Sequence, residues 1–263
     1  MRRLDWADYR RTEFAGIDPM ATIAVLPTAA IEQHGPHLPV GVDTMIAEGM
    51  LAELRRRCPD DLEPRILPVQ AVGKSNEHLD APGTLTLDAT TALAAWTQIG
   101  LSVARAGVRK IVIVNSHGGN LDLISILSRE LRVRAGMLAV KCQWGAFGAP
   151  EGLFSEFERT YGIHGGDSET SLMLHFQPQT VDMSKAERFA SAAEDAALQP
   201  IGPISRGWIA RDLNPKGTVG DAGLATAEKG RLTCAHQVAG FIDLLRQVRD
   251  APLDGLDPIP PLA

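Results

Sequence analysis

One stretch, residues 26–43, constrains the fold and the chemistry of this chain more than any other. It reads L-P-T-A-A-I-E-Q-H-G-P-H-L-P-V-G-V-D and follows the short apolar run A-T-I-A-V-L of residues 21–26. The apolar, β-branched run predicts a buried strand, and the prolines and glycines after it exclude a helix. Loops that leave the ends of buried strands commonly carry binding and catalytic residues in α/β proteins. The sequence therefore predicts that this loop carries chemistry.

The loop contains Glu32, His34 and His37, and Asp43 lies where an apolar pattern of helical spacing begins. Carboxylates and imidazoles are ligands for first-row metal ions. In extended backbone the side chains of Glu32 and His34 point to the same side, where both can reach one centre. Each residue also has an ordinary interpretation: Asp43 as a helix N-cap, Glu32 as a solvated acid, and the histidines as hydrogen-bonded loop residues. Their presence in one loop favours a metal site that takes further ligands from elsewhere.

The rest of the chain alternates predicted strands and helices. Strands are predicted at residues 65–71, 108–114 and 137–143, and helices at 45–57, 88–106, 121–135 and 232–248. This alternation predicts an α/β fold with a mostly parallel sheet and helices on both faces. No break in composition divides the chain, so we expect a single domain over residues 1–250. The prolines of residues 251–263 predict an extended or disordered tail.

Composition limits the partners and the compartment. The 263 residues carry a net charge of −6, which argues against an electrostatic nucleic-acid surface. No apolar run approaches the roughly 20 residues of a membrane-spanning helix, and the N-terminus lacks the apolar core of a signal peptide. The three cysteines are odd in number and widely spaced, which is typical of reduced thiols. We expect a cytoplasmic protein with no nucleic-acid or membrane partner.

Two further stretches carry residues of the same chemical kind. The predicted strand at 108–114 runs into N-S-H-G-G-N, which places His117 at the carboxyl end of a parallel strand, where α/β sheets bind ligands. The segment H-G-G-D-S-E-T-S-L begins at His164 and holds Glu169 directly before an apolar run. A buried, unpaired carboxylate is costly, so Glu169 needs a cation or strong hydrogen bonds. In the ordinary interpretation, His117 belongs to a glycine turn, and Asp167 or Glu169 caps a helix.

Together these three stretches resemble the signature segments of the creatininase (creatinine amidohydrolase) family. The resemblance extends to E-H-L-D-A-P-G-T at residues 77–84 and to G-T-V-G-D-A-G-L-A-T-A-E-K-G at residues 217–230, in matching order over most of the chain. It implies a single α/β domain that acts as a dinuclear metal hydrolase on a small-molecule substrate. It also implies a homo-oligomer, usually a ring-like hexamer.

The resemblance implies roles for individual residues. Glu32, Asp43 and His117 match the ligands of one metal ion. Asp43 matches a bridge to a second ion, which His34 also binds, and His164 matches the histidine that transfers a proton. The residues expected to line the pocket or to support the ligands are His37, Glu77, His78 and Asn120. Two divalent ions, Zn²⁺ or Mn²⁺, would lower the pKa of a shared water, and the hydroxide formed would attack a carbonyl carbon.

The chain departs from true creatininases at positions that bear on the substrate. Those enzymes carry a glutamate metal ligand two residues after the histidine that matches His117, where this chain has Gly119. We expect Glu169 to supply the missing ligand, with Asp167 as the competing candidate. Thr160 stands where a tryptophan packs over creatinine, so creatinine is not the expected substrate. The H-G-G-N turn resembles other branches of the family: a formamide deformylase, a peptidase of a cofactor-precursor peptide, and a hydrolase of oxidised inositol.

The sequence therefore predicts a metal-dependent amidohydrolase that cleaves an amide or formamide C–N bond of a small, cyclic or polar substrate. Three alternatives stay open: C–C cleavage of a cyclic ketone, cleavage of a precursor peptide, and metal binding without catalysis. The absence of the glutamate at position 119 motivates the last alternative. The other matched residues all remain, which argues against it.

Overall fold

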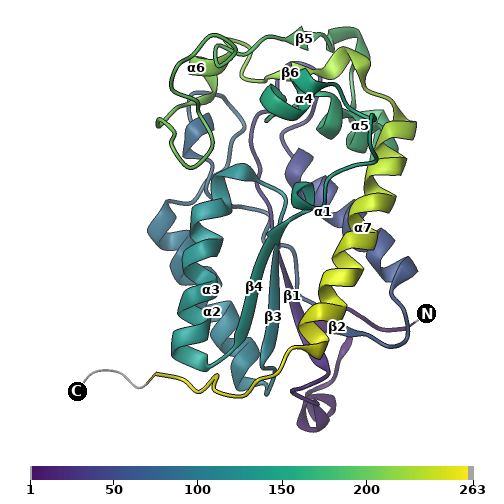
Figure 1. Ribbon diagram of the computed structural model, residues 1–263, viewed down its shortest axis with the longest axis vertical. Coiled ribbons are helices and arrows are strands. Elements are labelled where there is room, and N and C mark those ends of the chain that lie inside the picture. The colour runs from purple at the N-terminus through teal and green to yellow at the C-terminus, as the bar shows by residue number, and fades with distance from the viewer. Residues whose placement is uncertain (1, 260–263) are drawn as a thin grey trace.

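The structure is a computed structural model of the chain and describes residues 2–259. Its centre is a four-stranded parallel sheet with the strand order β2-β1-β3-β4 (Figure 1). The strands are β1 (Thr22–Thr28), β2 (Glu63–Ile66), β3 (Lys110–Asn115) and β4 (Leu138–Gln143). A short antiparallel pair, β5 (Arg188–Phe189) and β6 (Gly220–Asp221), lies beyond the carboxyl ends of the parallel strands, at the top of Figure 1.

Helices cover both faces of the sheet, as predicted, and other helices lie beyond its carboxyl edge (Figure 1). They are α1 (Val42–Arg57), α2 (Ala89–Arg105), α3 (Leu121–Ala135), α4 (Glu156–Tyr161), α5 (Asp167–Phe176), α6 (Ala210–Leu213) and α7 (Ala227–Asp250). Figure 1 shows α2 and α3 on one side of the sheet and α1 and α7 on the other. Helix α5 packs against α7 beyond the carboxyl ends of the strands.

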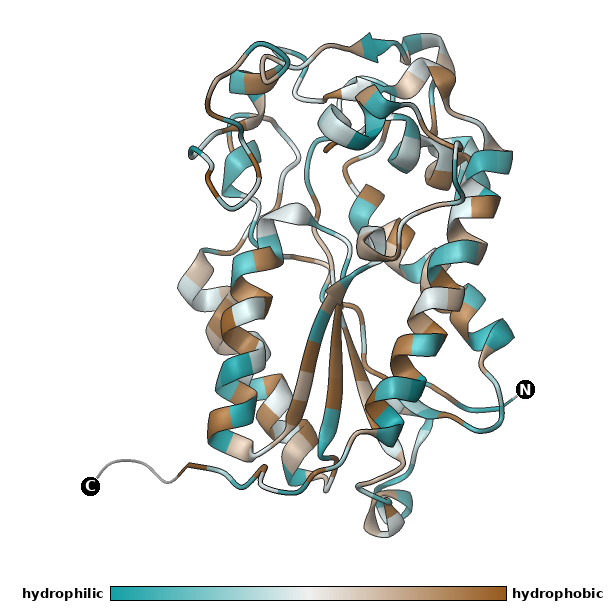
Figure 2. Cartoon of the chain, viewed as in Figure 1, coloured by the Kyte–Doolittle hydropathy of each residue, from teal (hydrophilic) through white to brown (hydrophobic). Residues whose placement is uncertain are grey.

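Strand β1 shows how the sheet holds these two layers together. Every residue of β1 is buried, and its side chains point alternately to the two faces. Ile23 and Val25 belong to the hydrophobic cluster of α1 and α7, whereas Ala24 and Leu26 belong to the cluster of α2 and α3. A parallel strand covered on both faces needs a continuous apolar run, which Figure 2 shows as brown along the central strands.

Most predicted elements are present, but some of their ends were wrong. Helix α1 begins at Val42 with Gly41 as its N-cap, so Asp43 lies inside the first turn and is not the N-cap. The strand predicted at 65–71 is instead β2, which ends at Ile66. Pro68 lies just beyond that end and has no N–H to give to a neighbouring strand. Helix α7 begins at Ala227, five residues earlier than predicted.

The described part of the predicted tail, residues 251–259, forms no helix or strand and passes the carboxyl end of α3 (Figure 1). The N–H of Ile259 donates to the carbonyl of Val133 at 2.8 Å. The Arg132 guanidinium donates to the carbonyls of Gly255 and Asp257. The remainder of that tail, residues 260–263, lies outside the described residues.

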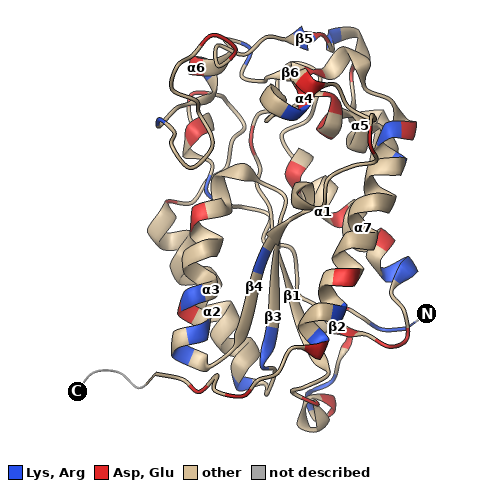
Figure 3. Cartoon of the chain, viewed as in Figure 1, with Lys and Arg blue, Asp and Glu red and all other residues tan. Residues whose placement is uncertain are grey.

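Two surface properties bear on the expected partners. None of the helices within residues 2–259 is both long enough and apolar enough to cross a membrane. In the view of Figure 3, Lys and Arg are interspersed with Asp and Glu along the helices.

Candidate metal centre

Acidic and imidazole side chains gather at the carboxyl ends of the parallel strands. The loop after β1 supplies Glu32 and His34, the first turn of α1 supplies Asp43, and the turn after β3 supplies His117. Strands β1 and β3 pair along almost their whole length, so the loops that follow them start side by side. Four of the residues predicted from the sequence are therefore brought together by the sheet itself.

The second half of the chain completes this cluster. His164 lies between α4 and α5, and Glu169 lies in the first turn of α5. The backbone of His164 pairs with Val219, whose N–H donates to the His164 carbonyl at 2.9 Å. Glu77 and His78 approach from the short 3-10 helix Asn76–His78. All of these side chains are largely buried, except that Glu169 keeps 25% of its side chain exposed.

His117 presents one ring nitrogen to two carboxylates. Its Nδ1 lies 3.2 Å from Oε1 of Glu32 and 3.4 Å from Oδ2 of Asp43. Its Nε2 lies 2.9 Å from the carbonyl of Lys74 and donates a hydrogen bond to it. In the neutral ring the proton therefore lies on Nε2, which leaves the Nδ1 lone pair to bind a cation between the carboxylates.

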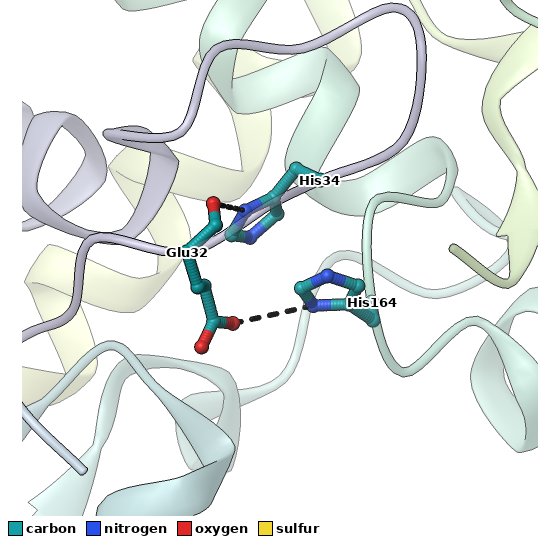
Figure 4. A group of neighbouring side chains, drawn as sticks. All are labelled: Glu32, His34 and His164. Carbon is teal, nitrogen blue, oxygen red and sulfur yellow. Dashed lines mark hydrogen bonds and ion pairs between the residues drawn. The ribbon is translucent and has the colours of Figure 1, made fainter. Parts of the chain in front are cut away.

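His34 has the opposite arrangement. Its Nδ1 donates to the backbone carbonyl of Glu32 at 3.0 Å, as the upper dashed line of Figure 4 shows. Its Nε2 lies 3.6 Å from Oδ1 of Asp43 and 3.8 Å from Oε2 of Glu169. The carboxylate of Asp43 thus directs one oxygen to each of the two imidazoles, His34 and His117.

Several buried polar atoms in this cluster lack a partner. Oε2 of Glu32, Nε2 of His34 and Oδ2 of Asp43 are buried and accept or donate no hydrogen bond within the described chain. Buried polar atoms are normally satisfied, because leaving one unpaired costs about 1–3 kcal/mol. Carboxylate oxygens and neutral imidazole nitrogens are ligands for divalent ions. The side chains present therefore fit bound divalent metal ions.

Three overlapping groups of side chains bring ligand atoms within 4.8 Å of one another. They are Glu32–His34–His164, Glu32–Glu77–His117 and His34–Asp43–Glu169. The third group contains the acid that the sequence analysis proposed as the replacement for the ligand missing at position 119. The first group contains His164, so the geometry allows His164 either to bind a cation or to stand free beside one.

The charges of the cluster change one another's pKa values. Burial lowers the pKa of His34, but the carboxylates of Asp43 and Glu169 outweigh it and raise the pKa to about 9. Burial raises the pKa of Glu169 to about 7. Burial and the neighbouring His34 lower the pKa of His164 well below its usual range. A cation that binds here must displace protons from His34 and Glu169, so its affinity should rise with pH.

His164 lies between two other imidazole rings. Its ring centroid is 4.1 Å from that of His34 and 4.3 Å from that of His78. Its Nε2 donates to the backbone carbonyl of Gln33 at 2.6 Å. Its Nδ1 lies 3.5 Å from Oε1 of Glu32, as the lower dashed line of Figure 4 shows. Nδ1 is therefore the nitrogen that faces the cluster.

Glu77 fills the space beside Gly119. A Cβ added at Gly119 would overlap Oε1 of Glu77 and Nε2 of His117. Glu77 Oε1 lies 3.5 Å from Nε2 of His117, and its Oε2 accepts from Nζ of Lys74 at 2.7 Å. An acid from another segment thus occupies the position into which a side chain at 119 would project.

Asp167 and His37 belong to none of the three ligand groups. Asp167 forms an ion pair with Lys229 and accepts from the hydroxyl of Ser171 at 3.0 Å. Nε2 of His37 hydrogen-bonds the hydroxyl of Thr170 at 2.9 Å. Asp167 is thus already paired with a cation of the chain, and His37 braces the loop against α5.

Asn120 and Gln33 organise the loops around the cluster. The Asn120 amide donates to the carbonyl of Ala29 and accepts from the N–H of Lys74, each at 3.0 Å, which ties three loops together. Gln33 was not among the residues predicted from the sequence. Its amide donates to Nδ1 of His78 at 2.8 Å, so the Nε2–H of His78 faces Oε1 of Glu32 at 3.5 Å. Only its place within the first motif could have indicated such a role.

Known proteins match most of the length of this chain. The family model Creatininase, described as creatinine amidohydrolase, matches residues 7–245. A mycofactocin precursor peptide peptidase of Mycobacterium ulcerans (strain Agy99) is 31% identical over 237 residues, which cover 88% of this chain and 87% of that protein. A creatinine amidohydrolase of Pseudomonas putida is 29% identical over 257 residues, which cover 93% and 95%. A 3-dehydro-scyllo-inosose hydrolase of Thermotoga maritima is 23% identical over 248 residues, which cover 87% and 77%.

Solved structures share the fold. A structure named "Creatininase Mn" superimposes with a TM-score of 0.72 at 23% identity and covers 95% of this chain and 100% of that chain. The likeness thus includes the parallel sheet, its helices and the segments beyond its carboxyl edge.

Proposed function

Since this chain belongs to the creatininase family of metal-dependent amidohydrolases, we propose that it hydrolyses a C–N bond of a small polar substrate at two divalent metal ions. One observation carries the proposal. Unpaired, buried ligand atoms of Glu32, His34 and Asp43 converge at the carboxyl edge of the sheet. The free Nδ1 of His117 and the carboxylate of Glu169 lie beside them.

We assign the ligands from the free atoms. Glu32, Asp43 and Nδ1 of His117 would hold one ion. Nε2 of His34, Asp43 and Glu169 would hold the other. Asp43 would serve both sites, because its two oxygens face the two different imidazoles. Ligands of carboxylate and imidazole without thiolate suit Zn²⁺ or Mn²⁺.

The metal ions and the side chains around them would have separate roles in the reaction. When bound, divalent ions polarise the substrate carbonyl and lower the pKa of water at the site. Nδ1 of His164 faces the cluster and would take a proton from the attacking water and pass it to the leaving nitrogen, while its Nε2–H stays on the carbonyl of Gln33. His78 directs its Nε2–H at Glu32 and holds that carboxylate in place.

The relatives favour a C–N bond over a C–C bond. The names of the peptidase and of the creatinine amidohydrolase both denote C–N hydrolysis, and these two relatives are more similar to this chain than the inosose hydrolase is. The inosose hydrolase nevertheless motivates a second candidate function, hydrolytic C–C cleavage of a cyclic ketone.

The test is a screen of the metal-loaded protein against formamides, short peptides, creatinine and inosose-type ketones. Release of an amine from an amide, lost on chelation and restored by Zn²⁺ or Mn²⁺, is the expected result. Turnover of the ketones alone would select the second candidate. Amide turnover that survives complete removal of metal would contradict the metal-dependent mechanism.

Creatinine should be a poor substrate. Thr160 lies exposed in α4 and offers no aromatic surface for stacking, a contact that contributes about 0.5–1.5 kcal/mol beyond burial. We expect creatinine turnover about 2–10-fold below that of the P. putida enzyme, since each 1.4 kcal/mol changes a rate by about tenfold. Initial rates of ring opening measure it. Turnover equal to that of the P. putida enzyme, assayed in parallel, would show that Thr160 is not a determinant.

Glu169→Gln should weaken one metal ion and spare the other. The amide keeps the shape but loses the negative charge beside His34, so we expect that ion to bind about 10–100-fold more weakly or worse. The ion at Glu32, Asp43 and His117 should stay within about twofold. Competitive titration with a chromophoric chelator separates the two affinities.

Asp167→Asn is the matched control. Asp167 is two residues away on the same helix, but it pairs with Lys229. Its loss should lower stability by about 1–3 kcal/mol without changing metal content. Normal metal binding in Glu169→Gln, or loss of an ion in Asp167→Asn, would reverse the assignment.

A further inference from the structure

A buried carboxylate outside the ligand set lies close to the segment that carries His164 and Glu169. Glu158, in α4, is 4% exposed. Its described partners are backbone N–H groups, and no described Lys, Arg or His forms an ion pair with it. Burial raises its pKa. Burying a carboxylate is costly, and solubility does not account for it here, because α4 has exposed positions for charged side chains.

The two oxygens of Glu158 join two separate segments. Oε1 accepts from the N–H of Ser168 at 3.0 Å, in the first turn of α5. Oε2 accepts from the N–H of Asp221 at 2.8 Å, in β6. Each hydrogen bond to a carboxylate is of the stronger, charge-assisted kind. Glu158 therefore fixes the start of α5 relative to β6.

Three glycines make room for this carboxylate. A Cβ added at Gly162, Gly166 or Gly220 would overlap the carboxyl atoms of Glu158. Gly162 and Gly166 have φ of −78° and −81°, which other residues adopt readily, so space rather than backbone conformation accounts for the missing side chains. These two glycines stand two residues before and two residues after His164.

The same region is held from its other side. The carbonyl of His164 accepts from the N–H of Val219 at 2.9 Å and from the hydroxyl of Thr218 at 2.6 Å. Residues 218–221 thus contact the backbone of His164 directly and contact α5 through Glu158. Loss of the Glu158 carboxylate would remove the link between the start of α5 and β6, and would leave Thr218 and Val219 as the contacts of residues 218–221 with this segment.

We propose that Glu158 is a positioning residue, whose carboxylate in the cradle of Gly162, Gly166 and Gly220 holds residues 164–169 in place. His164 is thereby kept against Glu32, and Glu169 against His34. This inference rests on the proposed function for the roles of those two residues. The bracing contact itself stands on the hydrogen bonds and on the glycine packing.

The experiment compares Glu158→Gln with Glu156→Gln, a matched control at an exposed position of the same helix. The amide keeps one acceptor oxygen but turns N–H donors toward a backbone N–H. We expect the ion near His34 and Glu169 to bind about 10–100-fold more weakly, as is typical when a supporting residue is changed. The ion at Glu32, Asp43 and His117 should bind as in the wild type, and kcat should fall more than KM rises.

Hydrogen exchange gives a readout that needs neither metal nor activity. In the metal-free protein, amides of residues 162–170 should exchange at least about tenfold faster in Glu158→Gln, while those of α7 keep their rates. If the wild type binds no metal, the proposed function fails, and this exchange measurement still decides whether Glu158 holds the segment. Unchanged exchange in 162–170, or equal loss of both ions, would overturn the inference.

Gly162→Ala perturbs the same contact from the opposite side and serves if Glu158→Gln does not fold. In the wild-type background the added methyl group should displace the carboxylate and reproduce the faster exchange of residues 162–170. In a Glu158→Ala background the overlap is gone, so Gly162→Ala should add nothing. Additive effects of the two changes would show that the carboxylate is not what the glycine accommodates, and would also overturn the inference.

Discussion

Replacing Asp43 with alanine is expected to remove both metal ions and to abolish hydrolysis. Asp43 is buried, and its two oxygens face His34 and His117, the imidazoles of the two proposed sites. Each site would lose a carboxylate, and the ligands that remain would be fewer than a typical divalent metal site has. Because metal ions contribute several kcal/mol to such reactions, activity should fall by at least about 1,000-fold. Elemental analysis of the metal-loaded, desalted variant measures the ion content directly.

Glu48→Ala is the control for this prediction, since Glu48 is an exposed acid on the same helix. It should keep both ions and full activity. Added metal should stabilise the wild type by about 2.7 kcal/mol at a free concentration 100 times its Kd, and should leave Asp43→Ala unchanged. Retention of two ions by Asp43→Ala would rule out a dinuclear centre that shares this residue.

The secondary structure was predictable where its signals are local. Residues 121–135 combine helical periodicity with a glycine at the end, and α3 has those same bounds. Gly136 closes the helix with φ of 62°, a conformation that favours glycine. The end of β2 was wrong because Arg65 to Ala71 is apolar enough for a strand, whereas pairing with β1 stops regular structure at Ile66. The end of this edge strand is set by its pairing with β1, and the local sequence does not indicate where that pairing stops.

The gathering of Glu32, His34, Asp43 and His117 was also expected, because parallel strands end at one edge and the motifs followed those ends. Glu169 follows none of these strands, and its place beside them was expected from the family resemblance. Their metal-binding roles remain predictions. What the sequence could not indicate is contact between distant segments. Glu158 lies in E-F-E-R-T-Y, a polar sequence typical of a solvated helix. In the structure it is buried, and its carboxylate accepts from the N–H of Asp221, 63 residues away in the chain.

Gly119 is a second position where a contact between distant segments could not be predicted from the sequence. The sequence shows that a side chain is missing there, but only the structure shows that Glu77 occupies the space. The tautomers of the histidines are likewise set by carbonyls of Glu32, Gln33 and Lys74, which no pattern of residue types specifies. The sequence thus identified residue types for the site, and the fold determines which atom of each is free.

The second large effect concerns His164, whose replacement should stop proton transfer without removing metal. His164 also belongs to a group with Glu32 and His34 that could hold an ion, so a ligand role is the alternative. Its Nδ1 lies 3.5 Å from Glu32 Oε1, which already has His117 Nδ1 at 3.2 Å. General acid–base groups contribute about 10²–10⁴-fold, so kcat of His164→Gln should fall by that factor.

The measured metal content separates the two roles. Replacing a ligand removes a bound ion, whereas replacing a proton-transfer group removes none. His164→Gln should keep both ions at affinities within about threefold of the wild type, whereas loss of a ligand typically costs far more. His236→Gln, a change at an exposed histidine on α7, should leave both kcat and metal content unchanged. If His164→Gln loses one ion together with its activity, His164 is a ligand. The proton for the leaving nitrogen must then come from another group at the site, and Glu77, beside His117, would be the first to replace.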